Sequence, residues 1–257
     1  MPTSNPRFVW YELMTGDVPA AEAFYKRVIG WESHDAGLAA GPYTVMLAAG
    51  AGVAGVMRTP AELQAIGVRA AWSGYIGVDD VQAMAARLER AGGHVLRPAA
   101  DIPGVGRFAV VTDPQGAEFM LFQPQPSDAP PPPAPGTPGT VGWHELHADD
   151  GPAAVAFYSD LFGWTAAEAI DMGKFGVYQT FEIDGVLVAG IMTRMPDTLT
   201  SGWRYYFRVE AADAATARVV GAGGRVTSPP HQVHNGDWIA HAVDPQGAEF
   251  RLVASTR

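Results

Sequence analysis

Residues 8–33, FVWYELMTGDVPAAEAFYKRVIGWES, decide the architecture, because the chain repeats them as residues 141–166, VGWHELHADDGPAAVAFYSDLFGWTA. A second match follows downstream, where residues 113–119, DPQGAEF, recur letter for letter as residues 244–250. Two long matches in the same order indicate an internal duplication. We therefore expect two domains of similar structure in this chain of 257 residues.

The repeats divide the chain into three parts. We expect one domain over residues 6–123, a second over residues 141–255, and a linker over residues 124–140. The linker reads PQPSDAPPPPAPGTPGT. So many prolines favour an extended, semi-rigid spacer that has no core of its own.

The composition is typical of a globular protein, with 47% hydrophobic and 17% charged residues. A net charge of −10 argues against nucleic acid and against anionic membrane surfaces as partners. The absence of cysteine excludes disulfides, zinc–thiolate sites, iron–sulfur clusters and a cysteine nucleophile. We see no signal peptide and no apolar run of the roughly 20 residues that span a bilayer, so we expect a cytoplasmic protein.

Each repeat is predicted to contain two βαβββ modules. Aromatic and branched residues at positions 8–14 predict a strand, and the helix that follows is capped by Asp17 and closed by Gly30. A second strand over residues 73–78 and a second helix over residues 81–91 repeat this order. Three short strands are expected after each helix, over residues 31–35, 43–49 and 53–57 and over residues 94–98, 107–112 and 118–123. The predicted fold class is therefore α+β, with four βαβββ modules in the chain.

This order of motifs resembles the vicinal oxygen chelate superfamily, which includes glyoxalase I, extradiol dioxygenases and bleomycin-resistance proteins. The motifs are an Asp after the first strand, Phe-Tyr seven residues later and a Gly-Trp turn after the helix. They stand here as Asp17, Phe24-Tyr25 and Gly30-Trp31, and again as Asp150, Phe157-Tyr158 and Gly163-Trp164. The chain is similar to a tandem subgroup labelled glyoxalase-like or hydroxylase. The resemblance implies two glyoxalase-like domains, each a half-open barrel with a cleft inside.

In the enzymes of this superfamily, the resemblance implies a divalent metal held by His, Gln or Glu side chains from the first and last strands of each module. The corresponding positions of this chain hold residues that do not suit a divalent cation. They are Trp10, Gly55, Ser73 and Met120 in the first repeat, and Trp143, Gly190, Arg204 and Arg251 in the second. We therefore predict no cofactor, and a divalent metal at a non-standard site is the alternative.

Side chains at alternate positions of these strands are the candidates for ligand binding, because alternate residues share a face. Aromatic rings and carboxylates in a cleft suit an organic ligand that carries polar groups. The candidates are Trp10, Glu12, Ser73, Tyr75, Glu118 and Met120 in the first repeat and Trp143, Glu145, His147, Arg204, Tyr206, Glu249 and Arg251 in the second. A plainer interpretation is also open: the tryptophans pack in the core, and the first-strand glutamates bind backbone groups or an arginine.

The second repeat is rich in histidine. His144 and His147 are three apart on a predicted strand, so we expect them to face opposite sides and not to chelate together. His231 and His234 lie in the segment HQVHNGDW, which reads as a solvent-exposed loop or as a loop folded over the second cleft.

Three functions are compatible with these observations. The favoured one is a protein of bleomycin-resistance type that binds a small organic ligand in aromatic clefts without the usual metal. The second is a lyase- or dioxygenase-type enzyme with a non-standard metal site built from Glu12, Glu118, Glu145, His147 or Glu249. The third is a structural or interaction module with one degenerate half. We expect a monomer, because two halves in one chain can pack as a pseudo-dimer.

Overall fold

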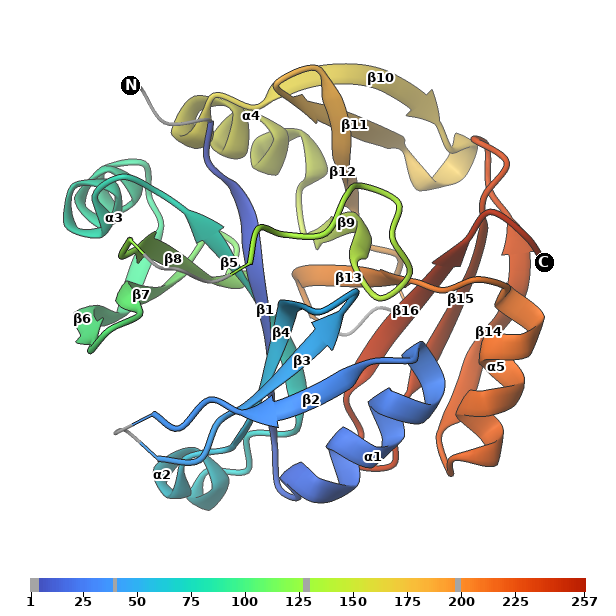
Figure 1. Ribbon diagram of the computed structural model, residues 1–257. Coiled ribbons are helices and arrows are strands. Elements are labelled where there is room, and N and C mark those ends of the chain that lie inside the picture. Colours follow the sequence, from blue (N-terminus) through green and yellow to red (C-terminus); the bar gives the residue numbers. More distant parts are fainter. Residues whose placement is uncertain (1–4, 39–40, 127–129, 197–199) are drawn as a thin grey trace. The chain divides into compact units, whose positions relative to one another are not determined.

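The computed structural model of the protein describes residues 5–38, 41–126, 130–196 and 200–257 (Figure 1). Each repeat holds two modules of the predicted βαβββ order. Modules 1 and 2 contain β1 (Arg7–Thr15), α1 (Val18–Ile29), β2 (Glu32–Asp35), β3 (Thr44–Ala48), β4 (Ala51–Arg58), α2 (Ala61–Ala65), β5 (Ala71–Gly77), α3 (Val81–Arg90), β6 (His94–Ile102), β7 (Gly106–Thr112) and β8 (Glu118–Pro124). Modules 3 and 4 contain β9 (Val141–Ala148), α4 (Gly151–Phe162), β10 (Thr165–Asp171), η1 (Gly173–Phe175), β11 (Val177–Ile183), β12 (Val186–Thr193), β13 (Gly202–Arg208), α5 (Ala212–Gly221), β14 (Arg225–Gln232), β15 (Trp238–Val243) and β16 (Glu249–Ala254).

The structure adds two elements that the sequence patterns do not predict, the short helix α2 and the 3-10 turn η1. Neither buries a residue, so neither leaves the apolar periodicity from which a helix is recognised. The long helices follow the expected signals. The side chain of Asp17 accepts the backbone N–H of Ala20, and Gly30 ends α1 in the left-handed region at φ 91°. Asp150 and Gly163 cap α4 in the same way.

The strands of each module form a four-stranded mixed array. The order is β2-β3-β4-β1 in module 1 and β10-β11-β12-β9 in module 3, and the first and last strands of these modules, β1 with β4 and β9 with β12, run parallel. Modules 2 and 4 have the orders β5-β8-β7-β6 and β13-β16-β15-β14, again with a parallel pair between the first and last strands. The α+β class with four repeated modules is therefore confirmed.

The chain forms two compact units, and each unit takes one module from each repeat. Compact unit 1 comprises Met1–Val9, Ser73–Ser127 and His144–Arg204, so it combines most of modules 2 and 3. Compact unit 2 comprises Trp10–Trp72, Asp128–Trp143 and Tyr205–Arg257, which are mainly modules 1 and 4. The sequence repeats and the compact units therefore do not coincide.

A buried tyrosine joins the two modules of each compact unit. In compact unit 2, the hydroxyl of Tyr25 accepts a hydrogen bond from Nε1 of Trp72 at 2.9 Å and donates one to Oδ2 of Asp244 at 3.1 Å. Compact unit 1 repeats this arrangement with Trp203, Tyr158 and Asp113, at 3.0 and 3.2 Å. Because buried polar groups need hydrogen-bond partners, each network holds a helix of one repeat against a turn of the other.

The DPQGAEF sequence is identical in both repeats, and its glutamine makes the same contacts in both. In compact unit 2, Oε1 of Gln246 accepts the backbone N–H of Asp17 at 2.7 Å, and its Nε2 donates to the Asp17 carbonyl at 2.8 Å. Gln115 binds both backbone groups of Asp150 at 2.6 and 2.9 Å in compact unit 1. Each Asp-Pro-Gln-Gly turn thus fixes the start of a helix in the other repeat.

The proline-rich segment is anchored at its end. Pro124 is the last residue of β8, one residue beyond the predicted domain edge, and residues 125–126 and 130–140 lie outside helices and strands. Residues 127–129 of the predicted linker lie outside the described residues. Nε1 of Trp31 donates to the carbonyl of Gly139 at 2.8 Å, and the backbone N–H of Arg208 donates to the carbonyl of Thr140 at 2.8 Å. The end of the linker is therefore part of compact unit 2.

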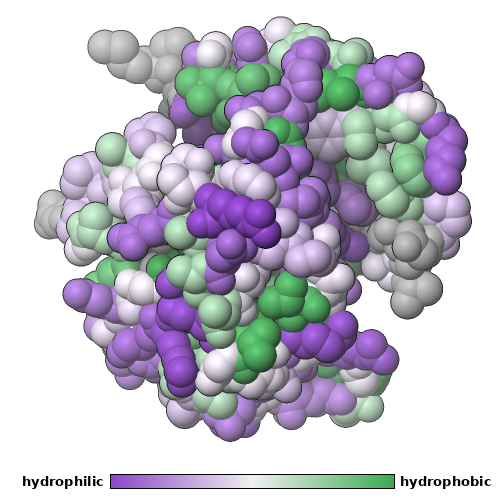
Figure 2. All heavy atoms as spheres, turned by 90° about the vertical axis from the view of Figure 1, so that its right-hand side faces the viewer, coloured by the Kyte–Doolittle hydropathy of each residue, from purple (hydrophilic) through white to green (hydrophobic). Residues whose placement is uncertain are grey.

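The surface carries mixed polarity. Figure 2 shows hydrophobic residues interspersed with hydrophilic ones on the face that it draws. Large apolar side chains that are exposed include Val177, Val186 and Leu187 on β11 and β12. In the described ranges, no helix combines the length and the apolar character that crossing a bilayer requires.

Candidate functional site

In the first repeat, Trp10, Glu12 and Tyr43 form a chain of hydrogen bonds. Nε1 of Trp10 donates to the hydroxyl of Tyr43 at 2.8 Å, and this hydroxyl donates to Oε2 of Glu12 at 2.9 Å. Burial and the adjacent carboxylate of Glu12 raise the pKa of Tyr43 well above its ordinary value, so the phenol keeps its proton at neutral pH. The two neighbours fix the direction of the bonds, because an indole can only donate and a carboxylate can only accept.

A glycine makes room for this tyrosine. Gly55 on β4 lies opposite Glu12 on β1 in the parallel register. A Cβ atom on Gly55 would lie 1.9 Å from the hydroxyl oxygen of Tyr43 and 2.3 Å from its Cζ. Only glycine leaves this space to the phenol, which can then reach the glutamate across the strand.

The second repeat keeps the same arrangement with one change. Glu145 on β9 lies opposite Gly190 on β12, and a Cβ on Gly190 would lie 2.2 Å from the hydroxyl of Tyr178. That hydroxyl donates to Oε2 of Glu145 at 3.2 Å. The change is His147, whose Nε2 lies 2.6 Å from Oε1 of Glu145. Met14 stands at the corresponding position of the first repeat.

His147 is buried and oriented by the glutamate. A carboxylate accepts hydrogen bonds, so Nε2 of His147 carries the hydrogen in this pair. Its other ring nitrogen, Nδ1, is buried and has no hydrogen-bond partner in the described part of the chain. With the hydrogen on Nε2, Nδ1 presents a lone pair.

His144 has a different role from His147 and lies on the opposite face of β9, as the sequence predicts. Its ring stacks on Phe8, with the centroids 4.4 Å apart, and its Nδ1 donates to the carbonyl of Val188 at 2.7 Å. Burial lowers the pKa of His144 to about 4. His144 is therefore a neutral packing residue at physiological pH.

The inner strands of module 2 carry an aromatic surface. Tyr75 on β5 pairs with Met120 on β8, and both are buried. The ring of Tyr75 lies 6.0 Å from that of Phe122 and 6.5 Å from that of Phe108. The guanidinium of Arg97 lies over the Phe108 ring, 4.8 Å from its centroid. Tyr75, Phe108, Phe122 and Arg97 therefore form one cluster of packed rings with a guanidinium beside it.

The inner strands of module 4 carry a more polar surface. Tyr206 on β13 pairs with Arg251 on β16, and both are buried. The Arg251 guanidinium lies 5.5 Å from the centroid of the Tyr206 ring, and its Nη1 lies 3.0 and 3.1 Å from the ring nitrogens of His241. The sequence assigned His231 to a loop, but the structure places it in β14, with its ring 6.1 Å from that of His241. Strand pairing with β15 decides this, because His231 lies opposite Ile239 in the register.

The other predicted residues are distributed more widely. Ser73 is buried, Trp143 is half-buried, and Glu118 and Glu249 are exposed at the starts of β8 and β16. Arg204 donates to the carbonyls of Trp203 and Thr200 at 3.2 and 3.4 Å. His234 is exposed beside a turn closed by the Val233 N–H and the Asp237 carbonyl.

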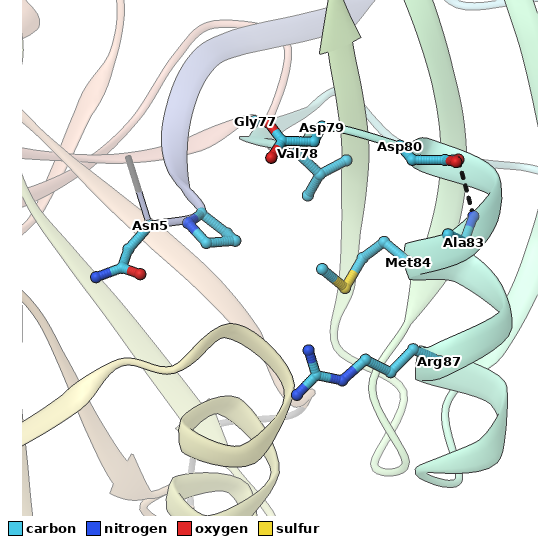
Figure 3. A pocket seen from close by; sticks show the side chains of 9 residues that line it. Asn5, Gly77, Val78, Asp79, Asp80, Ala83, Met84 and Arg87 are labelled. Atoms are coloured by element: carbon cyan, nitrogen blue, oxygen red, sulfur yellow. Dashed lines mark hydrogen bonds between the residues drawn. The ribbon is translucent and has the colours of Figure 1, made fainter. Parts of the chain in front are cut away.

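A surface pocket of about 320 Å³ lies in compact unit 1, and Figure 3 shows it from close by. Met84 and Arg87 extend toward it from α3, and Asn5 and Asp79 line it as well. Arg87 also donates to the carbonyl of Asp160. None of the candidate residues lines this pocket, so it is separate from the predicted site.

The family is settled by sequence comparison. Two matches to the family described as the Glyoxalase/Bleomycin resistance protein/Dioxygenase superfamily cover residues 7–121 and 140–252. The chain therefore belongs to this superfamily and contains its domain twice.

Relatives extend over nearly the whole chain. A Mycobacterium tuberculosis protein named "Putative glyoxylase CFP32" is 32% identical over 95% of this chain and 93% of its own length. The anthracycline biosynthesis protein DnrV of Streptomyces peucetius is 34% identical over 95% of this chain and 91% of its own. The fold is similar to that of a Mn(II)-bound glyoxalase from Novosphingobium aromaticivorans, with a TM-score of 0.65 at 20% identity over 99% of this chain and 83% of that one. It is also similar to the 2,3-dioxygenase LapB from Pseudomonas sp. KL28, with a TM-score of 0.66 at 14% identity over 100% and 94%.

The side chains of this protein do not fit the divalent metal of the superfamily's enzymes. The positions that the resemblance assigns to ligands hold indole, hydroxyl, thioether and guanidinium groups, or glycine. At both glycines, a tyrosine hydroxyl fills the space in which a ligand side chain would begin. Within the described residues, no three His, Cys, Asp or Glu side chains are placed to hold a metal ion.

The sequence patterns did not single out Tyr43 and Tyr178, although each donates a hydrogen bond to a candidate glutamate. Tyr43 directly precedes β3 and Tyr178 is the second residue of β11, and neither is part of a named motif. The available signal was their recurrence in the two repeats together with Gly55 and Gly190, which lie 12 residues further on in both cases, from 43 to 55 and from 178 to 190. A repeated tyrosine and a repeated strand glycine at one spacing indicate a ring lying over a backbone.

Proposed function

We propose that this protein binds a small, planar aromatic ligand that carries oxygen groups, and that it does so without the divalent metal of the superfamily's enzymes. The observation that carries the proposal is the glutamate–tyrosine pair over a strand glycine, which both repeats retain. Where a metal would polarise oxygen groups, this pair presents a carboxylate and an oriented phenol instead.

Aromatic residues of each compact unit, considered by itself, add the second part of the argument. Trp10 joins the pair in the first repeat, and Tyr75, Phe108 and Phe122 form an aromatic surface in module 2. Stacking on such rings contributes about 0.5–1.5 kcal/mol per ring pair beyond the area that is buried. Aromatic walls with a few polar groups are typical of sites for organic ligands.

One of the relatives supports the same class of ligand. DnrV is named for anthracycline biosynthesis, and anthracyclines are planar fused rings with hydroxyl and carbonyl oxygens. Hydroxyl groups of such a ligand would donate to Glu12, with the ring of Trp10 to stack on in the same compact unit, or to Glu145. We propose this polycyclic, oxygen-bearing class for the present protein.

The test is a titration of EDTA-treated protein with 1,4-dihydroxyanthraquinone, followed by tryptophan fluorescence and calorimetry. We expect saturable binding that EDTA does not change. Glu12→Gln and Tyr43→Phe should weaken it about tenfold, which corresponds to about 1.4 kcal/mol. The matched control is Glu32→Gln, an exposed glutamate on β2. Equal affinities in all variants, or no binding by the wild-type protein, would contradict the proposal.

A second candidate, a metal-dependent lyase or dioxygenase, retains one specific observation in its favour. Glu145 and His147 bring two potential donors together on β9, with Nδ1 of His147 unbonded in the described part of the chain. Calorimetric titration with Mn(II) decides between the two. Uptake of one metal per chain that is lost in His147→Ala would favour the enzyme, and no uptake is the result that we expect.

A further inference from the structure

The pocket of about 320 Å³ in compact unit 1 has one face of α3 as a wall. The residues of this wall stand at positions 80, 83, 84 and 87. Residues three, four and seven apart share a face of a helix, so their side chains border the same space. Figure 3 shows Met84 and Arg87 extending from this wall, with Asn5 on the other side of the space. The pocket therefore lies between α3 and the segment that leads into β1.

The wall opposite α3 is held by hydrogen bonds to module 3. Nδ2 of Asn5 donates to Oδ1 of Asp184 at 3.1 Å. The carbonyl of Pro6 accepts Nε1 of Trp164 at 2.7 Å. All four residues belong to compact unit 1. A wall that is fixed before binding reduces the entropy that a ligand must overcome.

Opposite charges stand at the two ends of the α3 wall. Asp80 caps the helix through one carboxylate oxygen, which accepts the backbone N–H of Ala83 at 2.9 Å, and the exposed Asp79 adds a second carboxylate at this end. At the other end, Nη2 of the exposed Arg87 donates to the carbonyl of Asp160. A guanidinium has five N–H donors. Within the described residues this carbonyl is the hydrogen-bond partner of Arg87, so donors remain for a ligand.

The equivalent helix of compact unit 2, α5, lacks this arrangement. Arg218 stands 131 residues after Arg87, and both its Nε and its Nη2 donate to the carbonyl of Val28, at 3.0 and 2.8 Å. Ala211 occupies the cap position without a side-chain hydrogen bond, and the buried Ala215 stands where the pocket has a half-buried methionine. A helix of this module therefore forms without the cap carboxylate and without the long apolar side chain. Packing of the module does not account for their presence on α3.

The α3 wall sets the length of a matching ligand. Asp80 and Arg87 are seven residues apart (87 − 80), which is about 10 Å at a rise of 1.5 Å per residue. An extended peptide spans about 3.3–3.6 Å per residue, so three residues cover this length. Met84 lies between the two ends and offers an apolar side chain that adapts to its partner. A simple anion would also meet the carboxylates, and a simple cation would also meet the guanidinium.

We propose that this pocket binds a short zwitterion of about tripeptide length. Its carboxylate contacts Arg87, its ammonium group lies at the end that carries Asp79 and Asp80, and its apolar middle lies on Met84. The pocket shares no residue with the glutamate–tyrosine pairs, so this inference goes beyond the proposed function and does not depend on it.

Three peptides of one sequence separate the two charges. They are Gly-Leu-Gly, its N-acetylated form, which lacks the ammonium group, and its C-terminal amide, which lacks the carboxylate. Titration of the isotope-labelled full chain, followed by NMR of the backbone amides, gives both the affinity and the location of binding. We expect Gly-Leu-Gly to bind about fivefold more tightly than either capped form. The signals that shift should be those of residues 77–87.

Variants assign the two charges to their partners. Arg87→Gln should bind Gly-Leu-Gly and its amide equally, and it should leave the affinity for the amide unchanged, because the amide has no carboxylate. Asp80→Asn keeps a side chain that caps helices and should weaken only the peptides with a free amino group. Arg90→Gln is the matched control, because Arg90 is exposed on the same helix and does not line the pocket; it should bind like the wild-type protein.

Three outcomes overturn the inference. They are equal affinities of the three peptides, an absence of signal shifts at residues 77–87, and an Arg87→Gln protein that still prefers the carboxylate form. Binding of 1,4-dihydroxyanthraquinone by Arg87→Gln should equal that of the wild-type protein. The peptide titration and the anthraquinone titration therefore test the two proposals separately, and either proposal can fail while the other stands.

Discussion

Gly55→Ala should displace the Tyr43 phenol and break the chain of hydrogen bonds between Trp10 and Glu12. The new methyl group would lie 1.9 Å from the phenol oxygen, far inside van der Waals contact. The side chain of Tyr43 can swing away, but its hydroxyl then loses the indole donor at 2.8 Å and the carboxylate acceptor at 2.9 Å. Gly55→Ala therefore lowers the free energy of unfolding by the stabilisation that these two hydrogen bonds contribute.

The magnitude follows from those two bonds. A neutral hydrogen bond contributes about 0.5–1.5 kcal/mol and one to a charged group about 1.5–3 kcal/mol. Replacing glycine by alanine within a strand also raises the free energy of unfolding by about 0.5–1 kcal/mol, because alanine lowers the conformational entropy of the unfolded chain. We expect Gly55→Ala to lower the free energy of unfolding by about 2–3 kcal/mol.

A double-mutant cycle with Tyr43→Ala tests the mechanism by urea unfolding. Without the phenol, the three atoms that lie nearest to the new methyl group are gone, so Gly55→Ala should become neutral or slightly stabilising. The coupling free energy between the two sites should then be about 3 kcal/mol. Equal costs of Gly55→Ala in both backgrounds would refute the steric argument. Gly190 faces Tyr178 in the second repeat, so Gly190→Ala should also lower the free energy of unfolding.

Three further predictions concern stability and assembly. His144 has a pKa of about 4 in the folded protein and about 6.5 when unfolded. Between these pH values the unfolded state binds more protons than the folded state. The free energy of unfolding should therefore fall by up to about 3 kcal/mol as the pH decreases from 7 to 4. His144→Asn should flatten that part of the pH profile in urea unfolding, whereas His94→Asn, at an exposed position, should leave it unchanged. Tyr25→Phe should cost about 2–4 kcal/mol, because buried Trp72 and Asp244 each lose a partner; an unchanged unfolding midpoint would contradict this account. Light scattering should give a monomer mass of 27.2 kDa. A stable dimer would refute the expectation that the two halves of one chain pack as a pseudo-dimer.

Local signals predicted much of the secondary structure. The helix α1 begins after Asp17 and ends at Gly30 because capping and left-handed backbone are properties of single residues. The contact between Glu145 and His147 also follows from the sequence, since residues two apart on a strand share a face. The apolar positions named by helical spacing in α1, among them Phe24 and Tyr25, are buried as expected.

The candidate site was predicted less completely, because its decisive contacts join different strands. Tyr43 reaches Glu12 over Gly55 only through the pairing of β1, β3 and β4. Arg251 meets His241 because β15 and β16 pair in one register. A shift of that register by one residue would turn every side chain to the other face, and the register depends on both strands and on their turn together, so the pattern of one strand alone does not give it.

The sequence by itself determined the duplication, the order of elements and the family, because these depend on repeats and on local periodicity. Tertiary structure alone decided how the modules combine. The compact units join modules from different repeats, through Tyr25 with Asp244 and Tyr158 with Asp113. Both repeats carry the same tyrosine and the same Asp-Pro-Gln-Gly turn, so the sequence is equally compatible with pairing inside one repeat. Only the path of the folded chain distinguishes the two arrangements.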